Sequence, residues 1–274
     1  MAAVRRLALL TLLYFCQGLP GGFLAQTLPV VVRTQGGTLL QTNLVQLVGL
    51  PWLGKLLWAP FVDRWGSARF GRRKTWMVPA LVGMIACTFA VGFFDPRVGL
   101  TVALVLFLLL NVFAATQDIA VDGFTVATMP DRDLGPANSA QVGGFKLGNI
   151  AGGGVLLLFI GAVGWLTSFT IMAGCLVVAL VAVLFTREPA SEVGPPVHVR
   201  TIVRGALDGL FAVPAFAAFL FASKFAESIA GVLIQPAMVD RGFDFEQIGL
   251  VDGIFGGVAT VVGAVAGGMM TRRI

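Results

Sequence analysis

Long apolar runs separated by short polar segments make up most of this 274-residue sequence. A helix needs about 20 apolar residues to cross roughly 30 Å of hydrocarbon. The pattern predicts eight helices of that kind, at residues 7–32, 42–62, 75–94, 98–128, 137–162, 165–186, 208–236 and 246–270. We therefore expect an all-α membrane protein.

The first apolar run follows Arg5 and Arg6, as the core of a signal peptide would. It continues past Gly18 and Pro20 to Val32, without a clear small-x-small cleavage site, and further spans follow it. We therefore interpret this run as the first transmembrane helix.

Composition and charge agree with the pattern. Hydrophobic residues make up 57% and charged residues 12%, against about 25% charged in a typical soluble domain, and the mean hydropathy is +0.89. The net charge of +5 does not imply a nucleic-acid partner, because basic residues gather on cytosolic loops of membrane proteins.

The basic residues also predict the orientation of the chain. If the eight helices alternate in direction, one side has only Arg33, Arg97 and Arg241. The other side collects Arg5, Arg6, Arg64, Arg69, Arg72, Arg73, Lys74, Arg132, Arg187, Arg200, Arg204, Arg272 and Arg273. This asymmetry predicts a cytosolic N-terminus, in the plasma (inner) membrane if the organism is a bacterium.

One polar segment suggests a division of the chain. Residues 187–207 include Pro195 and Pro196, which disfavour a helix, and read as a cytosolic linker. We therefore expect a six-helix transmembrane bundle at 1–186 and the start of a second bundle at 208–274.

The loop between the second and third predicted helices carries a dense set of charges. Asp63 stands beside Arg64, and Arg72 and Arg73 follow shortly after. A carboxylate there can accept from a helix N-terminus while arginines bind carboxylates and carbonyls, which would hold one conformer of a gate. Simple positive-inside anchoring would explain the arginines but not the Asp-Arg pair.

This loop resembles the one that marks the major facilitator superfamily of transporters. Ala59 stands at the family's small position, Asp63 and Arg64 match, and the Gly-Arg-Arg-Lys sequence at 71–74 matches after five inserted residues. A partial second copy follows the last predicted helix, with Thr271 where the Asp would be. The resemblance implies two six-helix halves around a central site. We then expect this chain to be truncated within the second half and unable to transport as a fragment.

Further segments resemble one branch of that family, which joins AmpG-type muropeptide permeases to acetyl-coenzyme A transporters. These segments are YFCQGLP at 14–20, KLLWAPFVDR at 55–64, FGRRKTWMVP at 70–79, ATQDIAVDG at 115–123 and NSAQVGGFKLGN at 138–149. The resemblance implies a polar, anionic substrate: muropeptide-like and moved by proton symport, or alternatively acetyl-coenzyme A.

Asp118 and Asp122 lie one turn apart at the end of a long apolar run, where a charge is costly and usually functional. If that helix is centred near Phe113, Asp118 lies roughly 7 Å and Asp122 roughly 13 Å to the cytosolic side. We expect Asp118 to face a cavity and Asp122 to belong to the gate, within reach of Arg72 and Arg73. Either carboxylate could instead be a hydrated cap or anchor.

Other polar residues inside predicted spans complete the candidate site for substrate and protons. They are Lys224, Glu227, Lys146, Gln117, Tyr14 and Gln17. In the family that the chain resembles, helices one, four and seven line the cavity, which places most of this set there. A buried carboxylate can take up a proton, so Asp118 or Glu227 could couple transport to a proton gradient. The lysines and Glu227 could instead form static ion pairs that orient helices.

Glycines at 144, 148 and 152 recur every fourth residue on the fifth predicted helix. Such a stripe lets two helix backbones approach closely. We expect helix packing there in preference to substrate binding.

The remaining sequence features argue against other classes of protein. His198 is the only histidine, and Cys16, Cys87 and Cys175 are scattered, so we expect no metal and no cofactor. No Ser/His pair, HExxH or Walker sequence supports an enzyme or direct ATP drive. A non-transporting membrane fragment or scaffold stays open, and we expect a monomer whose partners are a small-molecule substrate and the lipid bilayer.

Overall fold

The computed structural model describes residues 2–28, 45–67, 69–94, 96–188 and 249–270, with short pieces between 213 and 247. All regular elements in these ranges are helices, which confirms the all-α prediction. The chain divides into one unit at Met1–Ser191 with Gly249–Ile274 and another at Glu192–Ile248. The fold below is that of the first unit.

The helices follow the order of the predicted spans. They are α1 Ala2–Gly22 with a π turn η1 Phe23–Thr27, then η2 Val45–Gly49, α4 Leu50–Gly54, η3 Lys55–Leu57 and α5 Ala59–Arg64. Next come α6 Lys74–Val91, α7 Pro96–Thr128, α8 Asp131–Ile150, η4 Ala151–Val155, α9 Leu156–Val163 and α10 Trp165–Phe185. The last described elements are η5 Gly249–Phe255 and α14 Gly256–Met270.

Four described helices are long and apolar enough to cross a membrane, at Val4–Thr27, Lys74–Val91, Thr101–Thr128 and Trp165–Phe185. The second predicted span is instead divided by the 3-10 turn η3, and the fifth by the π turn η4. The predicted helix at 208–236 falls mostly outside the described residues.

The start of α8 differs from the sequence prediction. The helix begins at Asp131, whereas the apolar run indicated 137. Pro130 is extended, and Asp131 and Asp133 lie in the first turn, where carboxylates are stabilised by the positive end of the helix dipole. A polar N-terminal turn precedes the apolar span, and apolar runs do not detect it.

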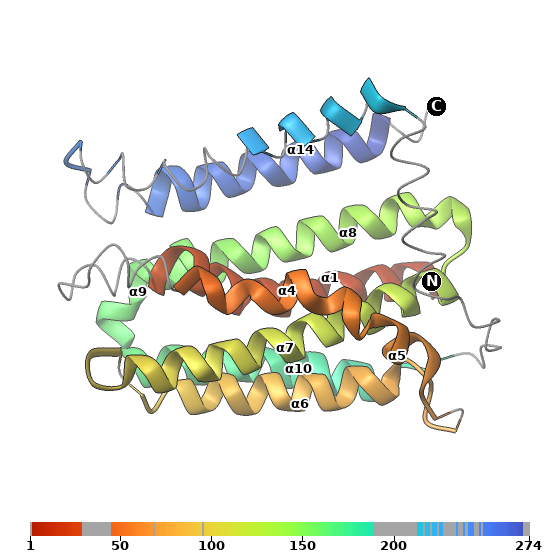
Figure 1. Ribbon diagram of the computed structural model, residues 1–274, viewed down its shortest axis with the longest axis horizontal. Coiled ribbons are helices and arrows are strands. Elements are labelled where there is room, and N and C mark those ends of the chain that lie inside the picture. The colour runs from red at the N-terminus through yellow and green to blue at the C-terminus, as the bar shows by residue number, and fades with distance from the viewer. Residues whose placement is uncertain are drawn as a thin grey trace. The chain divides into compact units, whose positions relative to one another are not determined.

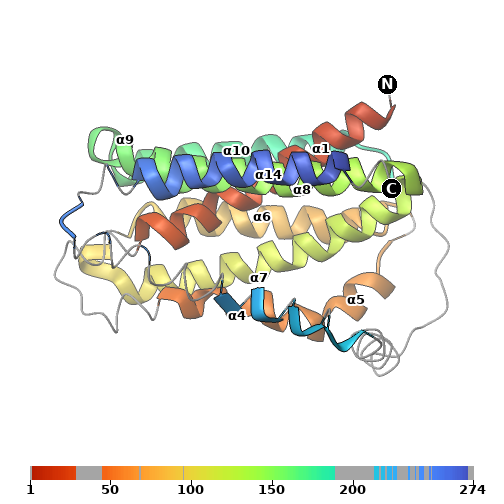
Figure 2. The same cartoon turned by 90° about the horizontal axis from the view of Figure 1, so that it is seen from above.

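The helices pack side by side with α1 against α8 and α10, and α6 against α7 and α10 (Figures 1 and 2). The backbone of α1 lies very close to those of α8 and the following η4. A Cβ on Gly148 would lie 2.1 Å from the carbonyl oxygen of Phe15, and one on Gly152 would lie 1.9 Å from that of Leu19. The helix-packing prediction for the glycine stripe is therefore confirmed.

The helix α14 lies along α8 on the side away from α6 (Figure 1). A Cβ on Gly257 would lie 2.4 Å from the side chain of Ile150. Residues 249–270 therefore pack against α8, in the same unit as the helices that precede them. The predicted linker at 187–207 lies almost wholly outside the described residues, and the predicted domain division stays a prediction.

The end of α10 and the start of α6 cap each other. The Glu188 carboxylate accepts hydrogen bonds from the backbone N–H groups of Arg73 and Lys74, at 3.0 and 3.1 Å. In return, the Lys74 ammonium donates to the carbonyl oxygens of Leu184 and Thr186, at 3.0 and 2.9 Å. Each charge satisfies backbone groups that a helix end leaves without partners, so the two ends form one joint.

Candidate functional site

The break in the second span is fastened to α7 by two indole side chains. Trp52 Nε1 donates to Asn111 Oδ1 at 2.8 Å, and Trp58 Nε1 donates to Thr116 Oγ1 at 3.2 Å. Between these anchors the chain forms the 3-10 turn η3, which begins at Lys55, directly after Gly54. The anchors fix the backbone of Lys55 beside α7.

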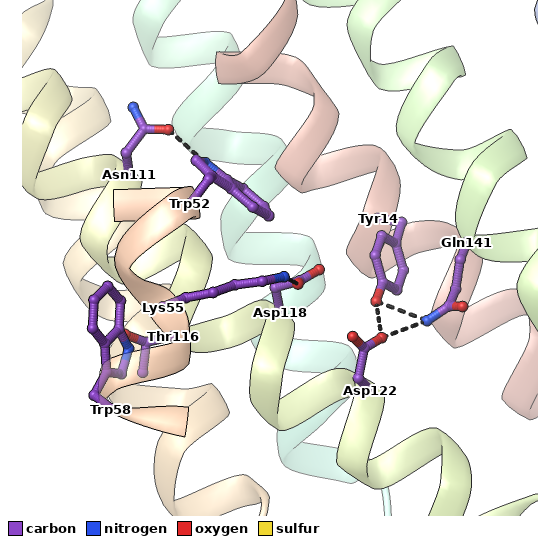
Figure 3. Close-up of polar contacts among 9 residues, drawn as sticks. All are labelled: Tyr14, Trp52, Lys55, Trp58, Asn111, Thr116, Asp118, Asp122 and Gln141. Atoms are coloured by element: carbon purple, nitrogen blue, oxygen red, sulfur yellow. Dashed lines mark hydrogen bonds and ion pairs between the residues drawn. The ribbon is translucent and has the colours of Figure 1, made fainter. Parts of the chain in front are cut away.

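Lys55 reaches from η3 across to Asp118 on α7 (Figure 3), with 2.5 Å between Nζ and Oδ2. Its ammonium also lies 5.3 Å from the ring centroid of Trp52. The side chain of Asp118 is 8% exposed and that of Lys55 is 29% exposed. The ion pair therefore joins a buried carboxylate to a cation that is partly exposed.

A second polar cluster ties three helices together one turn further along α7. Asp122 Oδ1 accepts from the Tyr14 hydroxyl of α1 at 2.5 Å and from Gln141 Nε2 of α8 at 2.7 Å (Figure 3). Gln141 also donates to the Tyr14 oxygen at 2.7 Å. The sequence analysis did not select Gln141. It stands three residues before Gly144, on the α8 face that meets α1, and that spacing could have identified it.

Two glutamines are buried near these clusters. Gln17 is 2% exposed and Gln117 is fully buried, and neither amide has a hydrogen-bond partner among the described residues. Arg6 donates to the Thr128 carbonyl and Tyr14 to Asp122, so α1 and α7 run antiparallel and Gln17 lies level with Gln117. A buried amide without a partner costs about 1–3 kcal/mol. Both amides therefore keep unused hydrogen-bonding capacity inside the described bundle.

A cavity of about 470 Å³ opens between the second span and α7. Its charged lining consists of Lys55, Asp63, Arg73 and Asp122. Arg73 pairs with Asp63, and a Cβ on Gly123 would lie 2.3 Å from the guanidinium carbon of Arg73. The arginine thus lies flat against α7, in a space that only glycine leaves free.

The other candidate residues are distributed as follows. Arg64 is exposed at the end of α5, and Arg72 is half-buried with its Nε atom unpartnered in the described structure. Lys146 is half-buried on α8, away from the cavity lining. Lys224 and Glu227 lie outside the described residues. Within the described ranges, no cluster of three or more His, Cys, Asp or Glu residues could hold a metal ion.

Gly123→Ala should disturb the Asp63–Arg73 ion pair, because the added methyl group occupies the place of the guanidinium. We expect a loss of stability of at most about 1 kcal/mol, because the guanidinium can move aside and the ion pair that it leaves is partly exposed. In an Arg73→Ala background the same substitution should cost less or nothing, so the double-mutant cycle should be non-additive. Equal costs of Gly123→Ala in both backgrounds would show that the guanidinium does not lie on Gly123.

The chain belongs to the Major Facilitator Superfamily, whose family model matches residues 10–274. It is therefore a multi-pass membrane protein of a family of transporters, not of enzymes. It is 27% identical to the Anhydromuropeptide permease of Escherichia coli (strain K12), over 98% of this chain and 56% of the relative.

Two other relatives are similar to a comparable degree. An uncharacterized protein of Haemophilus influenzae is 28% identical over 95% of this chain and 63% of its own length. The Putative transporter AmpG 4 of Rickettsia conorii is 26% identical over 98% and 68%. The chain thus spans between about half and two thirds of the curated relatives it matches, and the resemblance to the AmpG-type branch is confirmed.

Proposed function

We propose that this protein is a secondary active transporter that moves a muropeptide-like, anionic metabolite across the membrane by proton symport. The observation that carries the proposal is the ion pair between Asp118, buried on a membrane-spanning helix, and Lys55 on the facing span. An ionisable side chain inside a span is rare and marks a pathway for substrate or ions.

The Asp118 pair suits proton coupling for an electrostatic reason. A carboxylate in low dielectric is stabilised by the adjacent ammonium, so a proton and the lysine compete for the same oxygens. When the carboxylate is neutral the attraction ends and the lysine is free to move. One proton can thereby change the contacts between the second span and α7.

The substrate class is supported by two observations. The cavity of about 470 Å³ has the size of a small-molecule site, and the cations Lys55 and Arg73 line it together with the carboxylates of Asp63 and Asp122. The named relatives include a permease for anhydromuropeptides, which favours a muropeptide over the acetyl-coenzyme A alternative.

The remaining polar contacts fit a gate on the cytosolic side. In this proposal the basic loop and the N-terminus face the cytosol, as the positive-inside rule predicts. The Asp63–Arg73 pair and the Tyr14–Asp122–Gln141 cluster then hold that side of the bundle together. Opening toward the cytosol requires these contacts to separate.

Uptake into proteoliposomes tests the proposal. The full-length protein is reconstituted, an inward pH gradient is imposed, and accumulation of labelled anhydromuropeptide is measured with and without a protonophore. We expect the protonophore to abolish accumulation. We also expect unlabelled anhydromuropeptide to inhibit uptake of the labelled compound more strongly than acetyl-coenzyme A does. Accumulation that ignores the protonophore would refute proton symport, and stronger competition by acetyl-coenzyme A would refute the substrate class.

A further inference from the structure

Lys55 differs from Asp118 in its freedom to leave the pair. Asp118 is almost fully enclosed on a long, continuous helix, and it is not part of the cavity lining. Lys55 lines the cavity and has more than three times the exposed fraction, on a side chain with four rotatable bonds. The side chain of Lys55 therefore borders the cavity and ends at the carboxylate of Asp118, which lies outside the cavity lining.

The backbone of Lys55 is held by its neighbours in the chain, while its side chain is held at the ammonium, by Asp118 and the ring of Trp52. The indole groups of Trp52 and Trp58 fasten the chain to α7 on both sides of the turn. A rotation of the lysine side chain thus needs no movement of the span. The ammonium can swing from Asp118 into the cavity about a fixed point.

The charges around the pair decide where the ammonium goes. On α7 and the described elements that contact it, the ionisable groups acting on Asp118 are Lys55, Tyr14 and Asp122. In the cavity, Asp63 is engaged by Arg73. Asp122 already accepts two hydrogen bonds from Tyr14 and Gln141. Both of these hydrogen bonds come from neutral donors and reach Oδ1. Among the described residues that line the cavity, Asp122 is thus a carboxylate without a cationic partner, and a substrate carboxylate competes with it for a freed Lys55.

We infer that Lys55 is the residue that binds the carboxylate of the transported molecule, and that Asp118 holds its ammonium until Asp118 takes up a proton. This assignment rests on the proposed function and adds the group that recognises the substrate. Proton and substrate then bind cooperatively, because protonation of Asp118 frees the cation that the substrate needs. Substrate selectivity follows from the same exchange, since only an anion can replace Asp118 as the partner of Lys55.

Equilibrium binding to the purified full-length protein tests this exchange. The probes are an anhydromuropeptide with free carboxylates and its analogue with those carboxylates amidated. For the wild type, we expect Kd of the free acid to fall by up to about tenfold per unit decrease in pH, the limit for linkage to one proton. Kd of the amidated analogue should be about tenfold or more higher at low pH and should hardly change with pH.

The variants separate a binding role from a structural one. Lys55→Met should bind both probes equally and lose the pH dependence, while Lys55→Arg should restore preference for the free acid. Asp118→Asn should bind the free acid tightly at every pH, because the neutral amide imitates the protonated carboxylate. Arg132→Met removes an exposed cation from the start of α8 and should behave as the wild type.

The outcomes distinguish the inference from the proposed function. If Lys55→Met still prefers the free acid, or if Asp118→Asn keeps the pH dependence, the exchange is wrong although the protein transports the substrate. If the wild type neither binds nor accumulates the anhydromuropeptide, the proposed function itself is wrong. Should Lys55→Met fail to fold, the double variant with Asp118→Asn removes both charges together and should bind the two probes equally.

Discussion

Asp118→Asn should abolish accumulation of substrate driven by a pH gradient. The amide has the shape of the carboxylate but cannot exchange a proton, and it leaves Lys55 without its ionic partner. Uptake driven by the pH gradient should fall to the level of protein-free liposomes, a loss of about 100-fold or more for a coupling step that no other group replaces. Exchange of labelled for unlabelled substrate without a gradient should persist, because exchange needs no net movement of protons.

Glu227→Gln provides the second arm of this experiment. The sequence analysis gave Glu227 and Asp118 equal standing as proton carriers, and Glu227 lies outside the described residues. Full gradient-driven uptake in both variants, at normal expression, would exclude a proton role for either carboxylate. Loss in Asp118→Asn alone would assign the coupling to the pair with Lys55.

Gly148→Ala should be among the most destabilising additions of a single methyl group to the described bundle. The new Cβ would meet the carbonyl oxygen of Phe15 at 2.1 Å, so α1 and α8 would have to separate along their glycine contacts. Such backbone overpacking costs about 1–3 kcal/mol and occasionally more. We expect a lower melting temperature and less monodisperse protein after extraction in detergent, measured by thermal scanning and size-exclusion chromatography.

The same helix offers a matched control. Gly143 is five residues earlier on α8, and a Cβ there would meet nothing within 4 Å. Gly143→Ala should leave the melting temperature unchanged or raise it slightly, because alanine favours the helix more than glycine does. If the two substitutions have equal effects, the close approach of α1 and α8 does not contribute to stability.

The sequence predicted the parts of this fold that depend on runs and repeats. The apolar runs predicted α6, α7 and α10 to within a few residues, and the glycine spacing predicted a close helix contact. Breaks inside a span were missed, because η3 and η4 leave the apolar composition unchanged. Their cause is local, in residues such as Gly54 and the three consecutive glycines at 152–154.

Partners across the bundle were harder to predict than the residues themselves. Asp118 and Asp122 were recognised as unusual because the sequence alone shows a charge within an apolar run. The pairing of Asp118 with Lys55, and of Asp122 with Tyr14 and Gln141, depends on which helices are neighbours and at what depth they cross. Arg73 does lie next to Asp122, against Gly123 and in the same cavity lining, but its ion-pair partner is Asp63, which the sequence did not predict.

The mutual caps at Glu188 and Lys74 join the last helix of the first six to the helix that follows the basic loop. Any pull on the chain beyond Glu188 is therefore transmitted to the backbone of residues 73 and 74 before it can unwind α10. The residue next to that point, Arg73, also carries the contact with Asp63. The hydrogen bonds at Glu188 and Lys74 thus couple the end of α10 mechanically to the start of α6. A force on the chain beyond them acts first on the loop whose Arg73 holds Asp63.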